Sequence, residues 1–321
     1  MKQSQDRFTL WGIEVFIATV EEQSISAAAR RLDSSPATVS QQLTNLEKAI
    51  GTTLLNRNSR PVTPTPAGEM FRKRAQSILN EASLARTELA RADFSALTRF
   101  RLGMIEDFDA DVTPALLGQM AKSLQGCQFL LETGASHRLI DLLDARALDV
   151  IVAADMGATA DWMEIHPLLQ EPFVAAVPKG SVDLDQDILS QLQPRPLIQY
   201  TSRHHMGQQI SAHLARQNLT PAYQFELDSY HAIMAMVADG AGWSIITPLG
   251  WLRAQRFQDQ VELIPLPFAP LSRTLSLTAR RDVLQDMPAQ AAEELRPLLK
   301  NLIVDPMVER MPWLANELKL L

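Results

Sequence analysis

The chain has 321 residues, of which 46% are hydrophobic and 21% are charged, a composition that excludes disordered and fibrous proteins and allows two or three globular domains. The formal net charge is −7, but residues 1–93 carry 12 Lys and Arg against 10 Asp and Glu, so the acidity of the whole chain does not exclude an anionic partner for its N-terminal part. Charge alone does not separate such a binding surface from an ordinary solvated helix face.

The sequence carries no membrane or disulfide signal. Its longest apolar stretches are far too short to span a bilayer, and the polar residues 1–7 are not followed by the apolar core of a signal peptide. Cys127 is the only cysteine, which excludes an intrachain disulfide and fits a reducing compartment. We therefore expect a cytoplasmic protein with no membrane partner.

Helical patterns near the N-terminus predict a helix-turn-helix. Apolar residues recur at helical spacing over 8–22, a short helix is expected over 27–32 with Ser26 as its N-cap, and a third helix over 36–50 follows the cap Ser35. The third helix has an apolar stripe and a polar outer face. Two short helices joined by a tight turn in this way are typical of DNA-binding proteins, although amphipathic helices of this kind are common elsewhere.

A long segment without Gly or Pro between Glu69 and Asp93 predicts a single extended helix. Its apolar residues alternate at spacings of four and three, which is a heptad seam: Phe71, Ala75, Ile78, Ala82, Ala85, Leu89 and Ala92. A helix of about 25 residues is nearly 40 Å long, which favours a helix that projects and pairs with a second copy. The alternative is an amphipathic helix packed on its own domain.

Strand and helix patterns alternate after about residue 98. The strand candidates are 100–105, 128–132, 150–154, 173–177, 196–200, 223–227, 243–247 and 274–279, and the helices between them are 114–124, 137–145, 207–218 and 229–238. This alternation predicts an α/β fold with parallel sheets covered by helices. Apolar residues between 307 and 320 predict one more helix at the C-terminus.

The sequence does not support an enzyme. The histidines have no companion cysteine and no metal-binding spacing, so we interpret them as surface or pocket residues: His137, His166, His204, His205, His213 and His231. The Gly240-Ala241-Gly242 turn lacks the third glycine of a nucleotide-binding loop, and no serine occupies a nucleophile elbow. We expect no catalytic residues, no metal and no cofactor.

One extended pattern in the N-terminal part matches a known family in order and spacing. It comprises Phe16-Ile17-Ala18, Ser24 to Leu32, Ser35 to Leu43, Leu46-Glu47, Ile50-Gly51, Leu54 to Arg57 and Thr65 to Gly68. This pattern resembles the LysR family of bacterial transcription regulators. The resemblance implies a winged helix-turn-helix over 1–65, a linker helix for dimerisation over 66–93, and a two-lobed effector domain similar to periplasmic binding proteins over 94–300. The helical extension expected over 301–321 lies beyond the usual end of the family.

The same resemblance extends to details of the effector domain and of the recognition helix. It places lobe one at about 98–171 plus 270–300 and lobe two at 172–269. It implies DNA contacts from the recognition helix and the wing: Ser35, Pro36, Ala37, Thr38, Ser40, Gln41 and Arg57. Leu55 replaces the family's usual Phe, and Gln41 stands where Arg is frequent. Because glutamine reads adenine whereas arginine favours guanine, the target sequence is expected to differ from the commonest ones.

The effector is expected between the two lobes. The resemblance implies a site formed by three turns, which contain Glu106, Asp107, Phe108, Thr133, Ser136, Thr201, Ser202 and Arg203. Tyr200 and Trp243 are added to this site as candidate aromatic contacts for a cation. Relatives often carry Ser or Thr in the first turn, where this chain has acids that attract an amine. Aromatic side chains would add cation-binding faces, and Thr133 and residues 201–203 would hold a carboxylate. The alternative is that these acids only cap the following helix.

These observations predict a ligand-responsive regulator that binds double-stranded promoter DNA. Its effector is expected to be an amino-containing or zwitterionic small metabolite, and the family implies a dimer of dimers, hence a homotetramer. The alternative from a different class is a cytoplasmic small-molecule binding protein whose helix-turn-helix serves only protein contacts.

Overall fold

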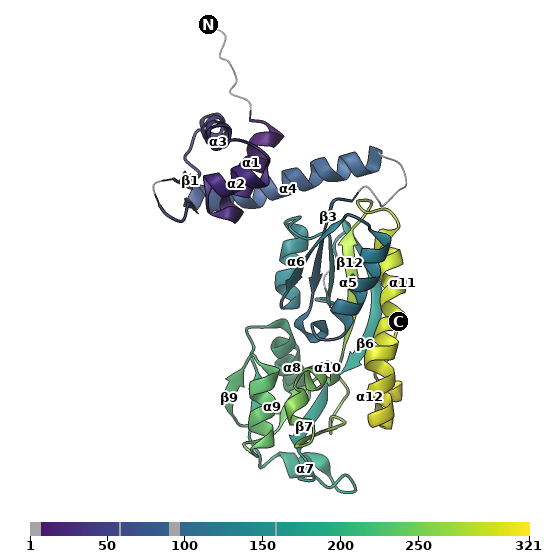
Figure 1. Cartoon of the computed structure of the whole chain (residues 1–321). Coiled ribbons are helices and arrows are strands. Elements are labelled where there is room, and N and C mark those ends of the chain that lie inside the picture. Colours follow the sequence, from purple (N-terminus) through teal and green to yellow (C-terminus); the bar gives the residue numbers. More distant parts are fainter. Residues whose placement is uncertain (1–7, 58, 90–96, 158) are drawn as a thin grey trace. The chain divides into compact units, whose positions relative to one another are not determined.

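The computed structural model describes residues 8–57, 59–89, 97–157 and 159–321, with the backbone alone for 83–89. Two compact units make up the chain (Figure 1). The first unit comprises the residues up to Leu97 together with Asp144–Ala147, and the second comprises all the others. None of the described helices is long and apolar enough to cross a membrane.

The first unit is a winged helix-turn-helix, as predicted. Its elements are α1 (Leu10–Glu22), α2 (Ile25–Arg31), α3 (Pro36–Ile50), the strands β1 (Leu55–Asn56) and β2 (Thr63–Pro64), and α4 (Pro66–Leu89). The two strands form an antiparallel hairpin, which is the wing. Apolar side chains of all three short helices and of the wing share one buried core that includes Ile13, Phe16, Val39, Leu43, Leu46, Leu54 and Leu55.

Local caps explain where these helices begin. Ser35 caps α3 by accepting a hydrogen bond from the backbone N–H of Thr38, and Pro36 occupies the first turn. The prediction of Ser26 as the cap of the second helix is wrong. The Ser24 hydroxyl accepts from the N–H of Ala27 at 3.3 Å instead, so α2 begins at Ile25 and Ser26 lies inside it. Both serines suit a cap, and Ile25, packed against the core, selects the earlier start.

The start of α4 packs on its own unit. The ring of Phe71 meets that of Phe16 edge to face with centroids 5.2 Å apart, Ala75 is completely buried, and Ile78 packs on the same core. The first three positions of the predicted seam are therefore used inside one chain, as the alternative interpretation held. Ala82 is the next seam position, while the side chains of the later ones lie outside the described residues.

Lobe one of the second unit is built on a six-stranded sheet in the order β13-β6-β12-β5-β3-β4. Its strands are β3 (Arg99–Met104), β4 (Gln128–Thr133), β5 (Val150–Ala154), β6 (Met163–Pro172), β12 (Ser272–Arg280) and β13 (Lys319–Leu320), and its helices are α5 (Val112–Ser123), α6 (Ser136–Asp144) and α11 (Met287–Leu299). Helix α11 packs on β6, β12 and α5.

Lobe two contains a three-stranded sheet in the order β10-β7-β11 and the pair β8-β9. Its strands are β7 (Val174–Pro178), β8 (Leu197–Tyr200), β9 (Tyr223–Leu227), β10 (Ser244–Ile246) and β11 (Val261–Ile264), and its helices are α7 (Ile188–Leu192), α8 (His205–Arg216), α9 (Tyr230–Ala238) and α10 (Pro248–Arg253). A bridge between Leu197 and Trp243 joins β8 to the segment before β10.

Two long strands connect the lobes (Figure 1). Strand β6 leads into β7 of lobe two through the single residue Phe173, and β12 brings the chain back beside β6. Because the chain runs out along one strand and back along the other, these two strands are antiparallel. The prediction of parallel sheets is therefore wrong for β12, which is antiparallel to both its neighbours, and for β10-β7-β11. It holds for β3, β4, β5 and for β8-β9.

The C-terminal extension is helical only in part. A π-helical turn (Lys300–Val304), α12 (Asp305–Arg310) and a 3-10 turn (Pro312–Asn316) are followed by β13. Strand β13 pairs with the outer edge of β6, so the prediction of helix to the end of the chain is wrong there. An unpaired strand edge exposes backbone N–H and C=O groups, and β13 pairs with this edge of β6 at Leu169 and Gln170.

Helix α8 approaches the end of β8 so closely that only glycine fits at one position. A Cβ on Gly207 would lie 2.0 Å from the carbonyl oxygen of Thr201. We expect Gly207→Ala to lower the free energy of unfolding by roughly 1–3 kcal/mol in urea titrations, because backbone must move to relieve the overlap. Gly118→Ala is the control, since a Cβ there meets nothing within 4 Å in α5, and it should stabilise by about 0.5–1 kcal/mol. Equal stabilities of the two variants would contradict the close approach.

Candidate nucleic-acid interface and ligand cavity

The outer face of α3 presents short polar side chains. Ser35, Pro36, Ala37, Thr38 and Gln41 are exposed and Ser40 is half-buried, whereas Val39, Leu43 and Leu46 on the opposite side are buried. The Gln41 amide donates to Asn45 Oδ1 at 2.9 Å, and the hydroxyls of Ser35 and Thr38 are 2.8 Å apart. Donors and acceptors without bulky charge suit contacts to base edges in a groove.

Arg57 is held against α3. Its guanidinium pairs with Glu47 and donates to the hydroxyl of Thr44 at 3.0 Å. The second oxygen of Glu47 accepts from the backbone N–H groups of Leu54 and Leu55 at 2.8 and 3.1 Å. One carboxylate thus ties the wing to the recognition helix. This positioning contact of Arg57 was not predicted, and a direct contact of Arg57 with DNA stays a prediction.

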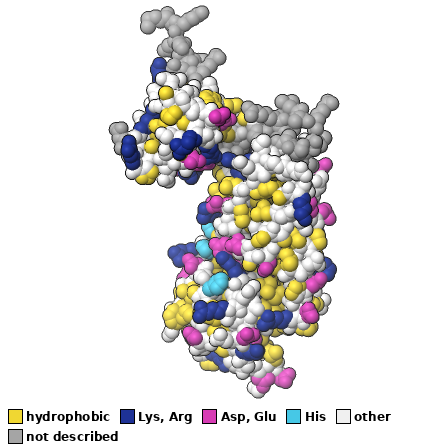
Figure 2. Space-filling model, viewed as in Figure 1, with side chains coloured by type: hydrophobic (Ala, Val, Ile, Leu, Met, Phe, Trp, Pro, Cys, Tyr) yellow, Lys and Arg dark blue, Asp and Glu magenta, His cyan; other side chains and the backbone are white. Residues whose placement is uncertain are grey.

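A cavity of about 340 Å³ lies between the two lobes of the second unit. Figure 2 shows histidine, acidic and basic side chains gathered midway along this unit. Lobe one lines the cavity with Ile105, Glu106, Asp107, Gly134, Ala135, Ser136, His137 and Ala154, and lobe two and the returning strand line it with Tyr200, His204, His205, Met206, Gln209, Asp228, Ser229, Tyr230, His231, Arg253 and Arg273.

Three helices begin at the cavity. Ser136 starts α6, His205 starts α8 and Tyr230 starts α9, and all three residues line the cavity wall. The first N–H groups of a helix carry partial positive charge and lack partners within the helix. This part of the wall is therefore suited to an anionic group.

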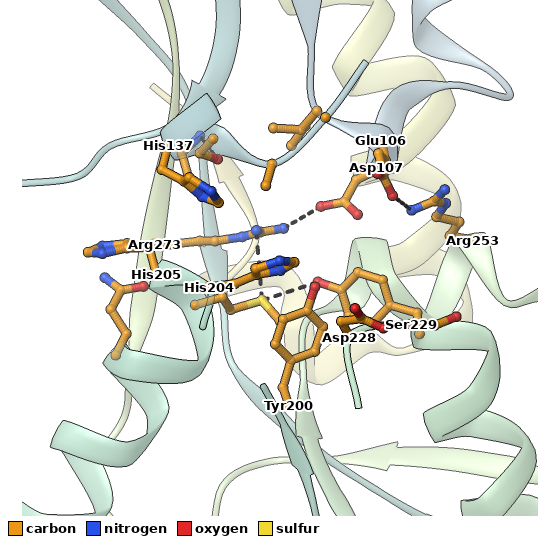
Figure 3. A pocket seen from close by; sticks show the side chains of 18 of the residues that line it. Glu106, Asp107, His137, Tyr200, His204, His205, Asp228, Ser229, Arg253 and Arg273 are labelled. Carbon is orange, nitrogen blue, oxygen red and sulfur yellow. Dashed lines mark hydrogen bonds and ion pairs between the residues drawn. The ribbon is translucent and has the colours of Figure 1, made fainter. Parts of the chain in front are cut away.

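A buried ion-pair cluster forms another part of the wall. Arg273 at the start of β12 donates through Nε to Glu171 Oε2 at 2.7 Å. It also donates through Nη2 to Asp107 Oδ2 at 2.7 Å, a bond that Figure 3 shows. The side chains of Arg273 and Asp107 are 7% exposed and that of Glu171 is 0% exposed. Burial raises the pKa of Glu171, an effect that Arg273 opposes. With both carboxylates ionised, two negative charges share one arginine, so the cluster carries a net charge of −1.

A second ion pair lies closer to solvent. Arg253 at the end of α10 donates to Glu106 Oε2 at 2.6 Å (Figure 3), and Asp109 Oδ2 is 4.0 Å from the same guanidinium. Burial raises the pKa of Asp109, while Arg253 opposes the shift. Glu106 and Asp107, in the turn that follows β3, are therefore each paired with an arginine from another part of the fold.

Aromatic and imidazole rings form a further part of the cavity wall. The ring centroids of His137 and His204 are 5.7 Å apart, and Tyr200 lies 6.0 Å from His204 and 5.5 Å from Tyr230. Burial, followed by the charge of Asp107, raises the pKa of Tyr200 to about 12, and burial lowers the pKa of His205. Near neutral pH the wall therefore offers a tyrosine hydroxyl and an uncharged imidazole. Among the described residues, no group of three or more side chains is arranged to hold a metal ion.

The structure brings only part of the predicted effector set to the cavity. Glu106, Asp107, Ser136 and Tyr200 line it. The others lie elsewhere: Phe108 is buried in the core, Thr133 ends β4, Thr201 and Ser202 bond to Glu226, Arg203 is exposed near Asp228, and Trp243 is buried beside a second cavity of about 450 Å³ in lobe two.

Arg253 and Arg273 are among the cavity residues that sequence reasoning missed. Arg273 lies 166 residues from Asp107, in a strand whose apolar pattern gives no sign of a binding residue. The pair His204-His205 was recognised as a surface or pocket pair, and both residues line the cavity.

Both units of the chain match known protein families. Residues 96–296 match the LysR substrate binding domain, and residues 10–69 match the bacterial regulatory helix-turn-helix protein, lysR family. The chain belongs to the LysR family. LysR-family proteins are DNA-binding transcription regulators with an effector domain and are not enzymes, which confirms the family, the fold class and the absence of enzymatic function predicted from the sequence.

Several relatives of this LysR-family protein have names that mention hydrogen peroxide. A probable hydrogen peroxide-inducible genes activator of Mycobacterium avium is 32% identical over 172 residues, which are 54% of this chain and 55% of that protein. The Escherichia coli dual regulator OxyR is 23% identical and aligns with 88% of this chain and 93% of its own.

Solved structures agree in fold. A full-length OxyR point variant from Pseudomonas aeruginosa superposes with a TM-score of 0.66 at 24% identity, covering 90% of this chain and 95% of that one. Full-length CbnR in complex with its target DNA gives a TM-score of 0.61 at 20% identity, with coverages of 90% and 99%. At these identities the likeness concerns the fold alone.

Replacing Gln41 tests the DNA-reading face of α3. We expect Gln41→Ala to weaken specific binding by roughly 1–3 kcal/mol and to relax the base preference, because an amide that pairs with an adenine edge is lost. Fluorescence anisotropy with the upstream DNA of the gene, measured over a range of salt concentrations, gives both quantities. The neighbouring Gln42→Ala is the control, since it removes the same group from the same helix outside the predicted set. Wild-type affinity and specificity in Gln41→Ala would remove Gln41 from the interface.

Proposed function

We propose that this chain is a ligand-responsive regulator whose effector is a small amino-containing metabolite, best a zwitterion such as an amino acid or a betaine, held between the lobes. Promoter DNA is read by α3 and the wing. The observation that carries the effector class is the asymmetry of the cavity wall, which has acids on one side and helix N-termini on another.

The acidic side suits the amino end of the ligand. With both carboxylates ionised, the cluster of Asp107, Glu171 and Arg273 has one more negative than positive charge, so it attracts a cation even though Asp107 is paired. Tyr200 and Tyr230 line the same wall and add ring faces that bind ammonium groups. An ammonium or quaternary ammonium group therefore gains both charge attraction and aromatic contact.

The helix N-termini suit the carboxylate end. The hydroxyls of Thr201 and Ser202 already donate hydrogen bonds to Glu226. We therefore no longer assign the ligand carboxylate to residues 201–203. The N–H groups at the starts of α6 and α8 supply the alternative. The adjacent His137 and His204 add hydrogen-bond donors.

Peroxide sensing through a thiol is not assigned to this chain, although relatives carry peroxide in their names. Cys127 is the only cysteine, it precedes β4, and it is absent from the cavity wall. Burial and the charge of Asp149 raise its pKa. Because the thiolate is the reactive form, a raised pKa lowers the reactivity of a thiol toward peroxide.

Assembly follows from the linker helix. Two copies pair through α4, and the effector domains join two such dimers into a homotetramer in the cytoplasm. Because Phe71, Ala75 and Ile78 pack on their own core, the pairing contact begins at Ala82 and continues toward the C-terminal end of α4.

Calorimetry on the full chain tests the effector class. Amino acids and betaines should bind with saturable heats, and simple dicarboxylates and aromatic acids should not, because only the former bring a cation to the acidic wall. The double variant Glu106→Gln with Asp107→Asn should weaken amino-ligand binding by about tenfold or more. Tight binding of the acids without binding of amino compounds, or an intact amino-ligand affinity in the double variant, would exclude the proposed class.

Light scattering tests the pairing helix. Ala82→Asp buries a charge in the proposed contact and should shift the oligomer toward smaller species at low protein concentration. Lys73→Asp places the same side chain at an exposed position outside the seam and should leave the oligomer unchanged. An unchanged oligomer in both variants would move the dimer contact away from Ala82.

A further inference from the structure

We propose that Asp107 is a tethered carboxylate that occupies the ligand-facing edge of Arg273, and that this occupation keeps the carboxylate group of a ligand off Arg273. Asp107 would thus determine specificity, and its removal would create a carboxylate site on Arg273. The inference concerns the same cavity as the proposed function and deepens it by naming a residue that rejects acidic ligands.

The guanidinium of Arg273 has one fixed partner and one exchangeable partner. Glu171 Oε2 takes the Nε side at 2.7 Å, and Glu171 Oε1 accepts from the backbone N–H of Leu249 at 2.7 Å. Both contacts are completely enclosed, and Glu171 does not line the cavity. Asp107, in contrast, lines the cavity together with Arg273. A ligand can therefore replace Asp107 but not Glu171.

The edge formed by Nη1 and Nη2 is only partly used. Nη2 donates to Asp107 Oδ2 at 2.7 Å, meets the Thr247 hydroxyl at 3.4 Å, and on its Nε side also lies 2.7 Å from Glu171 Oε2. Nη1 faces Met206 Sδ at 4.0 Å, and a thioether sulfur is a weak acceptor. Arginine binds a carboxylate best through two parallel N–H donors, so this edge has the chemistry of a carboxylate site that Asp107 fills with one hydrogen bond.

Displacement of Asp107 by a free carboxylate is unfavourable for electrostatic reasons. The incoming anion would take the hydrogen-bonded cation away from Asp107, whose side chain is only 7% exposed, and would add a third carboxylate next to the same arginine. An unpaired charge of this kind is costly to keep out of water. An ammonium ligand displaces nothing, because it approaches a cluster that is already negative. The same residue thus favours one ligand class and rejects the other.

The backbone around Asp107 fits this role. Asp107 lies in the short 3-10 turn Glu106–Phe108 that follows β3, and Phe108 anchors the turn in the core. The side chain of Asp107 points from this turn toward Arg273 across the cavity in Figure 3. Shortening Asp107 therefore opens space beside Arg273 without removing the anchor of the turn.

The decisive experiment gives the full chain a small anion as a substitute for the missing side chain. In Asp107→Ala, sodium acetate should bind saturably in calorimetry and raise the melting temperature, with an affinity about tenfold or more above that of wild type. Sodium chloride at equal ionic strength and neutral acetamide should do neither. Glu106→Ala is the matched control, because it removes the neighbouring carboxylate from the more exposed Arg253 and should gain little affinity for acetate.

Each result decides the proposal. A folded Asp107→Ala that gains no acetate binding, or a wild type that binds acetate as tightly as the variant, would overturn it. If Asp107→Ala does not fold alone, acetate but not chloride must restore its folded state, and failure to do so counts equally against the proposal. Binding of amino ligands by the wild type is measured separately. If the wild type does not bind them, the proposed effector class is excluded, whereas the acetate result is unaffected.

Discussion

The guanidinium of Arg273 joins three parts of the effector domain. Arg273 on β12 and Glu171 on β6 are register partners across the two strands that connect the lobes. Glu171 also accepts from Leu249 at the start of α10 in lobe two, and Arg273 reaches Asp107 in a lobe-one turn. A buried charge is tolerated only when it is paired and hydrogen-bonded, so these four positions must stay together. The two strands that connect the lobes, one helix of lobe two and one turn of lobe one therefore depend on the same contacts.

This cluster is also part of the cavity wall, which links ligand chemistry to the junction between the lobes. Asp107 and Arg273 line the cavity, and both side chains are only 7% exposed. The starts of α6 and α8 face the same space from lobe one and lobe two respectively. A ligand with opposite charges at its two ends can therefore contact both lobes at once, which is the physical requirement for a ligand to favour one arrangement of the lobes over another.

In the winged helix-turn-helix unit, the single carboxylate of Glu47 also joins separate segments of the chain. Glu47 on α3 accepts from two backbone N–H groups at the start of the wing and pairs with Arg57. The wing has only two short strands of two residues each, too few for a hairpin to hold its own position. Its placement beside the recognition helix therefore depends on this side chain and on Leu54 and Leu55 in the core.

The sequence by itself determined the family, the three short helices, most strands of the effector domain and a polar reading face on α3, because these follow from local spacing, caps and an ordered motif. The tertiary structure decided which residues far apart in the sequence contact one another, because residue spacing does not contain this information. It paired Asp107 with an arginine 166 residues away, turned Thr201 and Ser202 toward Glu226, and placed the first half of the heptad seam in the core of its own unit. It also set strand direction, since a chain that crosses between lobes must return antiparallel. Periodicity reports which face of an element is buried, whereas the partner on that face depends on contacts between segments far apart in the chain.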